Sequence, residues 1–318
     1  MNTAPKISLA KTLETYKPTP LVAYCLVTLS CFLWGLATVV GRGIYEEIPP
    51  FGLSFWRWLL AALVLLPLVW VDLPRKLPLI KANIKLIALL GFFQVGASAI
   101  LLVALNYTTA INASLINAAQ PVMTIIPAWI LTREKITFGQ GIGIILGLVG
   151  VVIMVSQGNL DILKSLEFNG GDIFAIMAVL GWTIYATLIH RVPSELGLTT
   201  TLFLVYLAGT IGLVPFYIVE HTFIRPVPLS WLTVGVVALL GIVVAAIAVS
   251  IWTASVRSIG PNRAAIFLNV IPVFGVSMAI IFLGEQLFTF HLIGAAFIGT
   301  GMALVIFMAR KKLSKKRE

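Results

Sequence analysis

Charged side chains are scarce in this sequence. Only 11% of its 318 residues are charged, whereas 59% are hydrophobic, and the mean hydropathy is +1.04. A typical soluble domain has roughly 25% charged residues, and a soluble globule needs polar side chains to cover its surface. The shortage excludes a water-soluble fold and predicts a polytopic membrane protein.

Cysteine, histidine and nucleotide-binding loops are also scarce. The two cysteines, Cys25 and Cys31, lie in one apolar stretch, so they form neither a disulfide framework nor a zinc-binding pattern. The histidines are scattered along the chain: His190, His221 and His291. No Gly-x-x-x-x-Gly-Lys-[Ser/Thr] loop is present to hold a nucleotide. We therefore expect no metal, no cofactor and no enzymatic activity.

Long apolar runs, in contrast, fill most of the chain. A helix that crosses a hydrocarbon core of about 30 Å needs about 20 apolar residues. Ten stretches qualify: 21–41, 51–70, 86–105, 111–131, 138–155, 173–189, 200–219, 231–254, 264–283 and 288–309. These runs are continuously apolar rather than alternating, which favours helices over strands. The predicted fold class is an all-α polytopic membrane protein with ten transmembrane helices.

The net charge of +10 belongs to the segments between these spans. If both ends of the chain are cytoplasmic, three of the 22 basic residues lie in external segments: Arg42, Lys164 and Arg225. This asymmetry is the positive-inside pattern of membrane proteins, so we expect no nucleic-acid partner. It predicts cytoplasmic tails over residues 1–20 and 310–318, the second of them basic, and a location in a bacterial inner (plasma) membrane.

A weak internal repeat divides the chain into two halves. Residues of the first half recur in the second at an offset of 151: Pro121, Glu134, Gly143 and Gly150 as Pro272, Glu285, Gly294 and Gly301. Five spans fall in residues 21–155 and five in residues 173–309, with an external linker over 156–172. Because five is odd, the second half enters the membrane from the opposite side. Inverted repeats of this kind are typical of secondary transporters, whose substrate site lies near the midplane between the halves.

The residues of the repeat also carry a family resemblance over about residues 21–309. The motifs are Trp34-Gly35, the run from Phe55 to Ala62 (Phe-Trp-Arg-Trp-Leu-Leu-Ala-Ala), Pro121 with Glu134, Pro272-Val273 and Leu283-Gly284-Glu285. Their order and spacing resemble the EamA-type drug/metabolite transporters. The resemblance implies ten helices in two inverted five-helix repeats and transport of small metabolites, often outward. Arg133-Glu134 stands where the family has a Gly-Glu pair, a departure in a loop that should leave the fold intact.

Polar side chains near the midplane are the candidate substrate site. Pro121 removes a backbone N–H and frees the carbonyl of Asn117, and Pro272 does the same beside Asn269. Amides buried in an apolar medium without partners cost several kcal/mol, so these side chains should face a water-filled cavity. The alternative is that they hold helices together, at about 0.6 kcal/mol each. The span that contains Pro121 also contains Gln120, a further candidate for substrate contact, and Pro127. Pro121, Pro127 and Pro272 are the candidates for gating.

Aromatic and polar pairs at helical spacing are further candidates for substrate contact. They are Gln94 with Ser98, Trp34 with Thr38, Trp182 with Tyr185, and Trp252. Amides and rings suit an amphipathic or aromatic ligand, because they offer stacking and cation–π contacts without a fixed charge. The alternative is that these tryptophans and tyrosines belong to the interfacial aromatic belt.

Arg57 is the charged residue that falls inside a predicted span. A charge at the bilayer centre costs about 3 kcal/mol on insertion scales, but the long side chain can snorkel or pair with Glu46 or Glu47. We interpret Arg57, and the loop acids Glu134 and Glu285, as structural charges. Binding of a substrate carboxylate by Arg57 is the alternative.

Taken together, these patterns predict a secondary transporter, an exporter or exchanger of small metabolites such as amino acids or amphipathic compounds. It would work by alternating access through a central midplane cavity. All acidic side chains are expected in loops or tails, so the substrate gradient is the expected driving force, with proton coupling left open. The alternatives are a membrane-embedded enzyme that modifies lipids or isoprenoids, and a passive channel.

The expected partners are a small-molecule substrate and the lipid bilayer. Small residues recur at helical spacing on two spans, as Gly139, Gly143 and Gly147 and as Ala295 and Gly299. Such faces pack helices closely, either within the protomer or across a homodimer.

Overall fold

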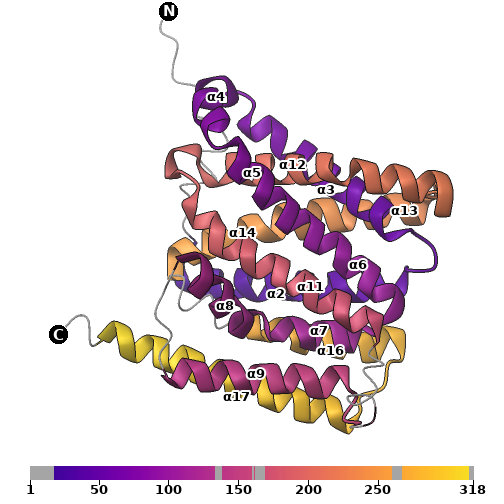
Figure 1. Cartoon of the computed structure of the whole chain (residues 1–318). Helices are drawn as coiled ribbons and strands as arrows, with labels where there is room; N and C mark the ends of the chain where they lie inside the picture. Colours follow the sequence, from indigo (N-terminus) through magenta and orange to yellow (C-terminus); the bar gives the residue numbers. More distant parts are fainter. Residues whose placement is uncertain (1–17, 133–137, 160, 162–168, 260–266, 315–318) are drawn as a thin grey trace, which may run out of the picture.

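The computed structural model describes residues 18–132, 138–159, 161, 169–259 and 267–314, and these ranges contain helices and no strand. Glu134 lies outside the described residues. Figure 1 shows the helices stacked in layers, with α9 and α17 side by side at one end of the stack and α3 and α12 toward the other. The all-helical class predicted from the sequence is confirmed.

The described elements of the first half follow one another in the order of the chain. They are α2 (Pro20–Gly43), α3 (Pro50–Val69), α4 (Leu73–Ala82), α5 (Ile84–Gly91), the π-helix η1 (Phe92–Gly96), α6 (Ala97–Tyr107), α7 (Ala110–Ala118), α8 (Gln120–Thr132) and α9 (Phe138–Val155).

The second half begins after the linker. Its elements are α11 (Gly170–Leu188), the 3-10 helices η2 (Ile189–Arg191) and η3 (Ser194–Leu196), α12 (Leu198–Val219), the π-helix η4 (Glu220–Ile224), α13 (Trp231–Ala238), the π-helix η5 (Leu239–Ile247), α14 (Ala248–Ile259), the 3-10 helix η6 (Leu268–Val270), α16 (Ile271–Leu283) and α17 (Thr289–Ser314).

Helix starts follow local sequence signals. Pro20 and Pro50 open α2 and α3, where a missing N–H costs nothing. Thr109 and Asn169 accept hydrogen bonds from backbone N–H groups in the first turns of α7 and α11, as N-cap residues do. The segment expected as the loop between the second and third spans contains a further helix, α4.

Among the described residues, six helices are long and apolar enough to cross a membrane: Pro20–Gly43, Pro50–Val69, Ile84–Tyr107, Gly170–Arg191, Leu198–Ile224 and Trp231–Val256. The apolar helices over Gly141–Met154, Leu268–Leu283 and Thr289–Leu304 are shorter, and the predicted span 111–131 is divided between α7 and α8. A helix therefore lies at each predicted span, while the count of ten crossing helices stays a prediction.

The surface is apolar in a way that suits lipid. Large side chains are widely exposed, among them Trp231 at 91%, Phe138 at 88% and Phe223 at 79%. Monomeric soluble proteins rarely expose contiguous apolar patches of more than a few hundred Å². Acyl chains offer these side chains an environment as apolar as the protein interior.

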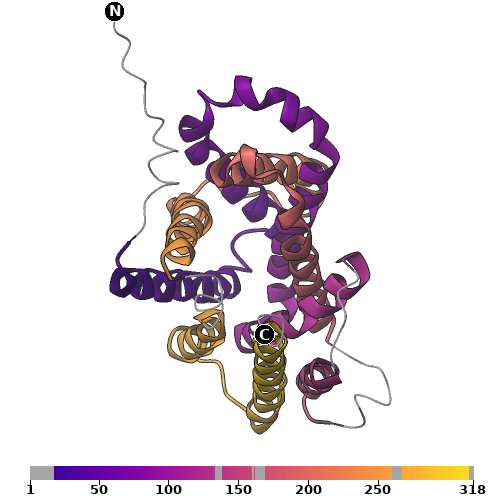
Figure 2. The ribbon, with the colours of Figure 1, turned by 90° about the vertical axis from the view of Figure 1, so that its left-hand side faces the viewer.

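Helix contacts are matched between the two halves. The second helices of the halves, α3 and α12, pack together, as do the last ones, α9 and α17. The first helix α2 packs against α14 and α16, and its counterpart α11 packs against α6 and α8. Figure 2, turned by 90°, shows the same helices from one side of the stack. These contacts thus have counterparts in the two halves, as the repeat predicts.

Glycines allow α9 and α17 to cross closely within one chain. A methyl group built on Gly150 would lie 2.7 Å from the carbonyl oxygen of Gly294, and one on Gly301 would lie 2.5 Å from that of Gly143. These four glycines are the two pairs related by the repeat. Gly299, in contrast, has nothing within 4 Å of such a methyl group. The crossing therefore uses Gly294 and Gly301 of α17 rather than the predicted Ala295–Gly299 face.

Candidate functional site

Two π-helical segments interrupt equivalent spans of the two halves. The positions of η1, in the third span, fall within η5, in the eighth, when they are shifted by the repeat offset of 151. A π-helix pairs each N–H with the carbonyl five residues back, and such turns are frequent at functional sites. Sequence periodicity gave no sign of these interruptions.

Each π segment has a carbonyl that accepts a side-chain hydrogen bond. The Trp182 indole N–H donates to the carbonyl of Gln94 at 3.3 Å, and the Tyr206 hydroxyl donates to that of Ala245, also at 3.3 Å. Gln94 and Ala245 are 151 residues apart, so they are equivalent in the repeat. The structure thus brings together two predicted site residues, Trp182 and Gln94.

A second pair of predicted residues meets between the first and eighth spans. The rings of Trp34 and Trp252 have centroids 5.2 Å apart and planes tilted by 53°, which is a favourable aromatic contact. Both side chains are partly buried, so the pair lies between α2 and α14 rather than at an exposed belt. Thr38, one turn beyond Trp34, is buried.

The fourth span breaks beside Asn117. Helix α7 ends at Ala118 and α8 begins at Gln120, and Pro121 is the second residue of α8. The Asn117 Oδ1 atom is buried and has no hydrogen-bond partner in the part of the chain that the structure describes. Gln120 is partly buried, and Pro127 lies buried inside α8.

The ninth span has a matching break at Asn269. The 3-10 turn η6 contains Asn269 and ends at Val270, and Pro272 is at the second position of α16. The two prolines therefore start helices in equivalent places of the two halves. Asn269 is partly buried, like Asn117.

Helices α2, α7 and α16 converge close to these breaks. A methyl group on Gly35 would lie 3.0 Å from the backbone nitrogen of Gly275, and one on Gly275 would meet the hydroxyl of Ser114. The Ser114 Oγ atom is buried and, like Asn117 Oδ1 one turn later, has no partner among the described residues. Two unpaired polar oxygens therefore lie on one helix at the contact between the halves.

Two predicted residues lie apart from this region. Tyr185 packs with an apolar cluster that also contains Trp58 and Tyr206, between α3 and α12. Ser98, in α6, is buried at 4% exposure. No described contact joins either side chain to Trp34 or Asn117.

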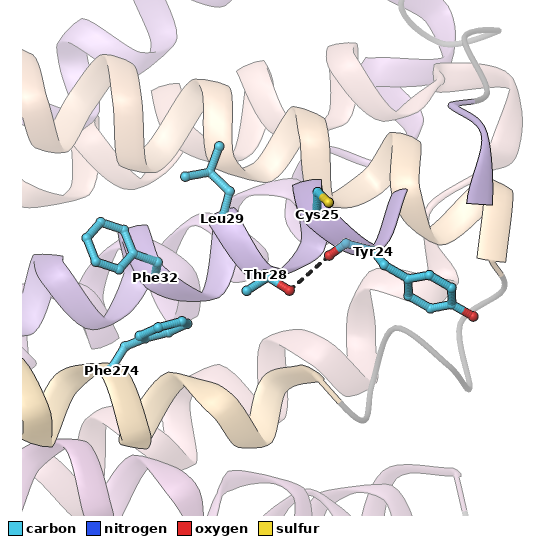
Figure 3. A pocket seen from close by; sticks show the side chains of 6 residues that line it. All are labelled: Tyr24, Cys25, Thr28, Leu29, Phe32 and Phe274. Atoms are coloured by element: carbon cyan, nitrogen blue, oxygen red, sulfur yellow. Dashed lines mark hydrogen bonds between the residues drawn. The ribbon is translucent and has the colours of Figure 1, made fainter. Parts of the chain in front are cut away.

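An apolar groove of about 520 Å³ opens between α2 and α16. Figure 3 shows the side chains that line it: Tyr24, Cys25, Thr28, Leu29, Phe32 and Phe274. The hydroxyl of Thr28 donates to the carbonyl of Tyr24, so the groove offers little polar recognition. None of the predicted substrate residues lines it.

Arg57 is buried in α3, at 8% exposure. Its guanidinium carbon lies 5.2 Å from the centre of the Trp58 ring, a cation–π distance. Its Nε atom has no partner, and in the described ranges no ion pair joins it to Glu46 or Glu47. Pairing with these glutamates, one of the two options for Arg57, is therefore not seen among the described residues.

Acidic side chains bind helix N-termini across the two halves. Glu285 accepts hydrogen bonds from the backbone nitrogens of Ala110 and Ile111, at 2.8 and 2.9 Å, in the first turn of α7. Glu220 accepts from those of Phe51 and Gly52, at 3.2 and 2.7 Å, in the first turn of α3. Carboxylates satisfy free N–H groups and the helix dipole at these positions.

The positively charged Arg225 makes a further contact between the halves, on the face that the sequence predicts to be external. Its guanidinium donates to the carbonyls of Tyr45 and Glu46, in the loop between α2 and α3. The hydroxyl of Tyr45 donates to the Glu46 carboxylate at 2.6 Å, and this bond raises the pKa of the Tyr45 hydroxyl.

Asp172 corrects the expectation that all acidic side chains lie in loops or tails. It is fully buried, at 0% exposure, within α11, and Glu220 is 5% exposed within the helical span Leu198–Ile224. Asp172 fell in the predicted linker because the apolar run begins only at Ile173. The sequence Asn169-Gly-Gly-Asp172, an N-cap residue with an acid three positions later, was the signal that the helix starts earlier.

The fold and these contacts define an integral membrane protein, made of two matched sets of helices that meet around polar and aromatic side chains. The EamA-like transporter family matches residues 21–156 and 169–307. The chain therefore belongs to the EamA-like transporter family.

Individual relatives agree with this assignment. The transporter YyaM of Bacillus subtilis (strain 168) is 30% identical over 261 residues, which cover 80% of this chain and 83% of the relative. A probable amino-acid metabolite efflux pump of Escherichia coli (strain K12) is 25% identical and covers 92% of this chain and 97% of its own length. A protein of known crystal structure has the same fold, with a TM-score of 0.56 at 19% identity over 90% of this chain and 98% of that one.

Proposed function

We propose that the protein is a secondary carrier that exports or exchanges small metabolites by alternating access. The observation that carries this proposal is the buried Oδ1 atom of Asn117 at the broken fourth span, which has no hydrogen-bond partner among the described residues. A buried polar atom without a partner costs about 1–3 kcal/mol, a cost that a bound solute or water would remove. Broken helices around a central site are typical of carriers built from repeats.

The matched breaks support the same mechanism. Helices α7 and α8 meet at Ala119, and η6 leads into α16 beside Pro272. Interrupted helices can change their angle without breaking a continuous hydrogen-bond ladder. The two breaks would let one half rock against the other, so that the site opens to each side of the membrane in turn.

The substrate class follows from the surrounding side chains. Trp34 and Trp252 offer ring faces. Amide groups come from Asn117, Asn269 and Gln120. Arg57 is the charged side chain that the sequence predicts within a membrane span. Rings and amides suit a small neutral, zwitterionic or amphipathic solute. The relative named as a probable amino-acid metabolite efflux pump supports amino acids as the first class to test.

Transport by the purified protein in proteoliposomes tests the proposal. The panel consists of amino acids, nucleosides, sugars and cationic drugs. We expect saturable flux and counterflow for at least one amino acid or amphipathic solute. Flux that rises linearly with concentration would indicate a channel, and the absence of movement for every solute would contradict the carrier.

Substitution of the two amides tests the site itself. Asn117→Ala and Asn269→Ala should weaken the apparent affinity about tenfold, because a lost hydrogen bond of about 1.4 kcal/mol corresponds to that factor. The control is Asn83→Ala, which removes an amide that donates to the carbonyl of Leu79 at the α4–α5 junction. Equal affinity in all three variants would contradict the assignment of the site.

A further inference from the structure

A chain of hydrogen bonds links three buried side chains of the two halves. The backbone N–H of Phe288 donates to His291 Nδ1 at 2.9 Å, and His291 Nε2 lies 2.8 Å from Asn112 Oδ1. Asn112 Nδ2 lies 3.2 and 3.3 Å from the two carboxylate oxygens of Asp172. Thr108 also donates its hydroxyl to Asp172.

The groups at the two ends of this row of hydrogen bonds determine which atom donates and which accepts in each bond. A backbone N–H only donates, so His291 Nδ1 must accept and Nε2 must carry the proton. Asn112 therefore accepts through its oxygen and donates through its nitrogen. An ionised carboxylate only accepts, so Asp172 completes the chain with all groups satisfied.

One added proton weakens this arrangement. A protonated Asp172 can donate to the Thr108 hydroxyl only if that hydroxyl turns and gives up its own bond to the carboxylate. The bond from the Asn112 amide nitrogen then loses the negative charge that strengthens it. If Asn112 turns to offer its oxygen to Asp172, its nitrogen faces the N–H of His291. His291 cannot give up that proton position without losing the hydrogen bond from Phe288 at the start of α17.

Helix capping does not account for Asp172. The N-cap of α11 is Asn169, whose side chain already accepts from the N–H of Gly171 at 2.8 Å. The recorded hydrogen bonds of the Asp172 carboxylate come instead from Thr108 and Asn112, both in the first half. A fully buried carboxylate that neutral groups hold is costly to keep charged, so a proton is its natural ligand.

In the part of the chain that the structure describes, the titratable groups around Asp172 include no counter-charge. Helices α7 and α8 have no ionisable side chain, α6 ends with the exposed Tyr107, and α17 contributes His291. Glu285 occupies the first turn of α7. Arg42 of α2 donates to the carbonyl of Leu105 at the end of α6, and no ion pair joins it to Asp172 in the described ranges.

The chain of bonds joins the halves on one face of the molecule. Thr108 and Asn112 belong to the first half, and Asp172 and His291 belong to the second. Glu285 joins the same two halves through α7, and Glu220 does so through α3. The distribution of basic residues predicts that this face is external.

We propose that Asp172 is a proton-binding site of the carrier, and that proton uptake there from the external side releases the contact between the halves made through Asn112 and His291. This inference rests on the proposed carrier function, which it extends from a substrate-driven to a proton-coupled transporter. The proton adds to one oxygen of the Asp172 carboxylate. Opening of the external face then follows the weakening of the bonds that the charged carboxylate accepts, and inward proton movement drives solute outward.

Distance measurements by electron–electron double resonance test the proposal without a known substrate. Spin labels are attached to cysteines introduced by Tyr107→Cys and Gln286→Cys, one on each half and both at exposed positions. The background is Cys25→Ser with Cys31→Ala. We expect the distance to lengthen between pH 8 and pH 5, with a midpoint for one proton. A distance that does not change over this range would overturn the proposal.

Substitutions assign the midpoint to Asp172. Asp172→Asn should remove the pH dependence. Thr108→Val, which keeps the carboxylate but removes a bond that favours its charged form, should move the midpoint about one unit toward higher pH. The control is Glu47→Gln, an exposed acid on the same predicted face, and it should leave the midpoint unchanged. A wild-type midpoint in Asp172→Asn would overturn the proposal; if that variant does not fold, an unmoved midpoint in Thr108→Val would do so.

Flux measurements separate this proposal from the carrier function. An inward proton gradient should speed solute export from proteoliposomes in the wild type and have no effect in Asp172→Asn. Saturable flux that ignores the gradient in the wild type would overturn proton coupling and leave the carrier intact. No flux of any solute would contradict the carrier, while the spin-label distances would still decide whether Asp172 controls the external face.

Discussion

Two carboxylates, one buried and one partly buried, bind directly between the two halves. Glu220 and Glu285 each bind two backbone N–H groups at the start of a helix in the other half. Free N–H groups at a helix start have no partner within the helix, and a negative charge there also interacts favourably with the dipole. These contacts join the two halves on one face of the molecule.

Glu220→Gln tests this role at the level of one residue. The amide keeps one acceptor but turns an NH₂ group toward a backbone donor, so we expect a loss of about 1–2 kcal/mol. The apparent melting temperature in detergent should fall by roughly 2–4 °C. Glu47→Gln, at an exposed position, is the control, and an equal melting temperature for the two variants would contradict the role of Glu220.

The sequence identifies candidate residues but not their partners. Pattern and repeat singled out Glu285, but only the fold shows that its carboxylate binds Ala110 and Ile111 of the other half. No sequence pattern links Trp34 with Trp252. The two rings meet because α2 packs against α14. Such contacts join residues more than 170 positions apart, and local periodicity contains no information about them.

At the scale of helices, the apolar runs predicted where the helices lie but not where the helices are interrupted. The run 51–70 corresponds to Pro50–Val69, and 200–219 to Leu198–Val219. The breaks beside Pro121 and Pro272 follow from proline chemistry, whereas the π segments η1 and η5 occur in runs without proline. The length of an apolar run predicts where a span lies. It does not predict whether its backbone N–H groups bond to the fourth or the fifth carbonyl back.

Crossing of α9 and α17 gives a prediction at this scale. Gly301→Ala places a methyl group 2.5 Å from the carbonyl oxygen of Gly143, so the helices must separate and the apparent melting temperature should fall. Gly299→Ala is the matched control on the same helix, because nothing lies within 4 Å of the added group. It should be neutral or slightly stabilising, since alanine favours helix over glycine. Equal destabilisation by both changes would contradict the observed crossing.

For the whole molecule, the repeat is the feature that organises the rest. It relates the breaks beside Pro121 and Pro272, the π-helical carbonyls of Gln94 and Ala245, and the glycine pairs of α9 and α17. The odd number of predicted spans in each half turns this repetition into an inversion. An inverted pair can expose one central site to either side by exchanging the conformations of its halves, which is the physical basis of the proposed transport.

Sidedness of two equivalent positions is the measurement that tests the inversion most directly. Val71 and Thr222 are 151 residues apart and both exposed, so single cysteines introduced there, with Cys25→Ser and Cys31→Ala, can be labelled in intact cells that express the protein. A thiol reagent that does not cross the membrane should label the cysteine at 222 and spare the one at 71 until the cells are opened. Labelling of both positions, or of neither, from outside intact cells would contradict two inverted halves.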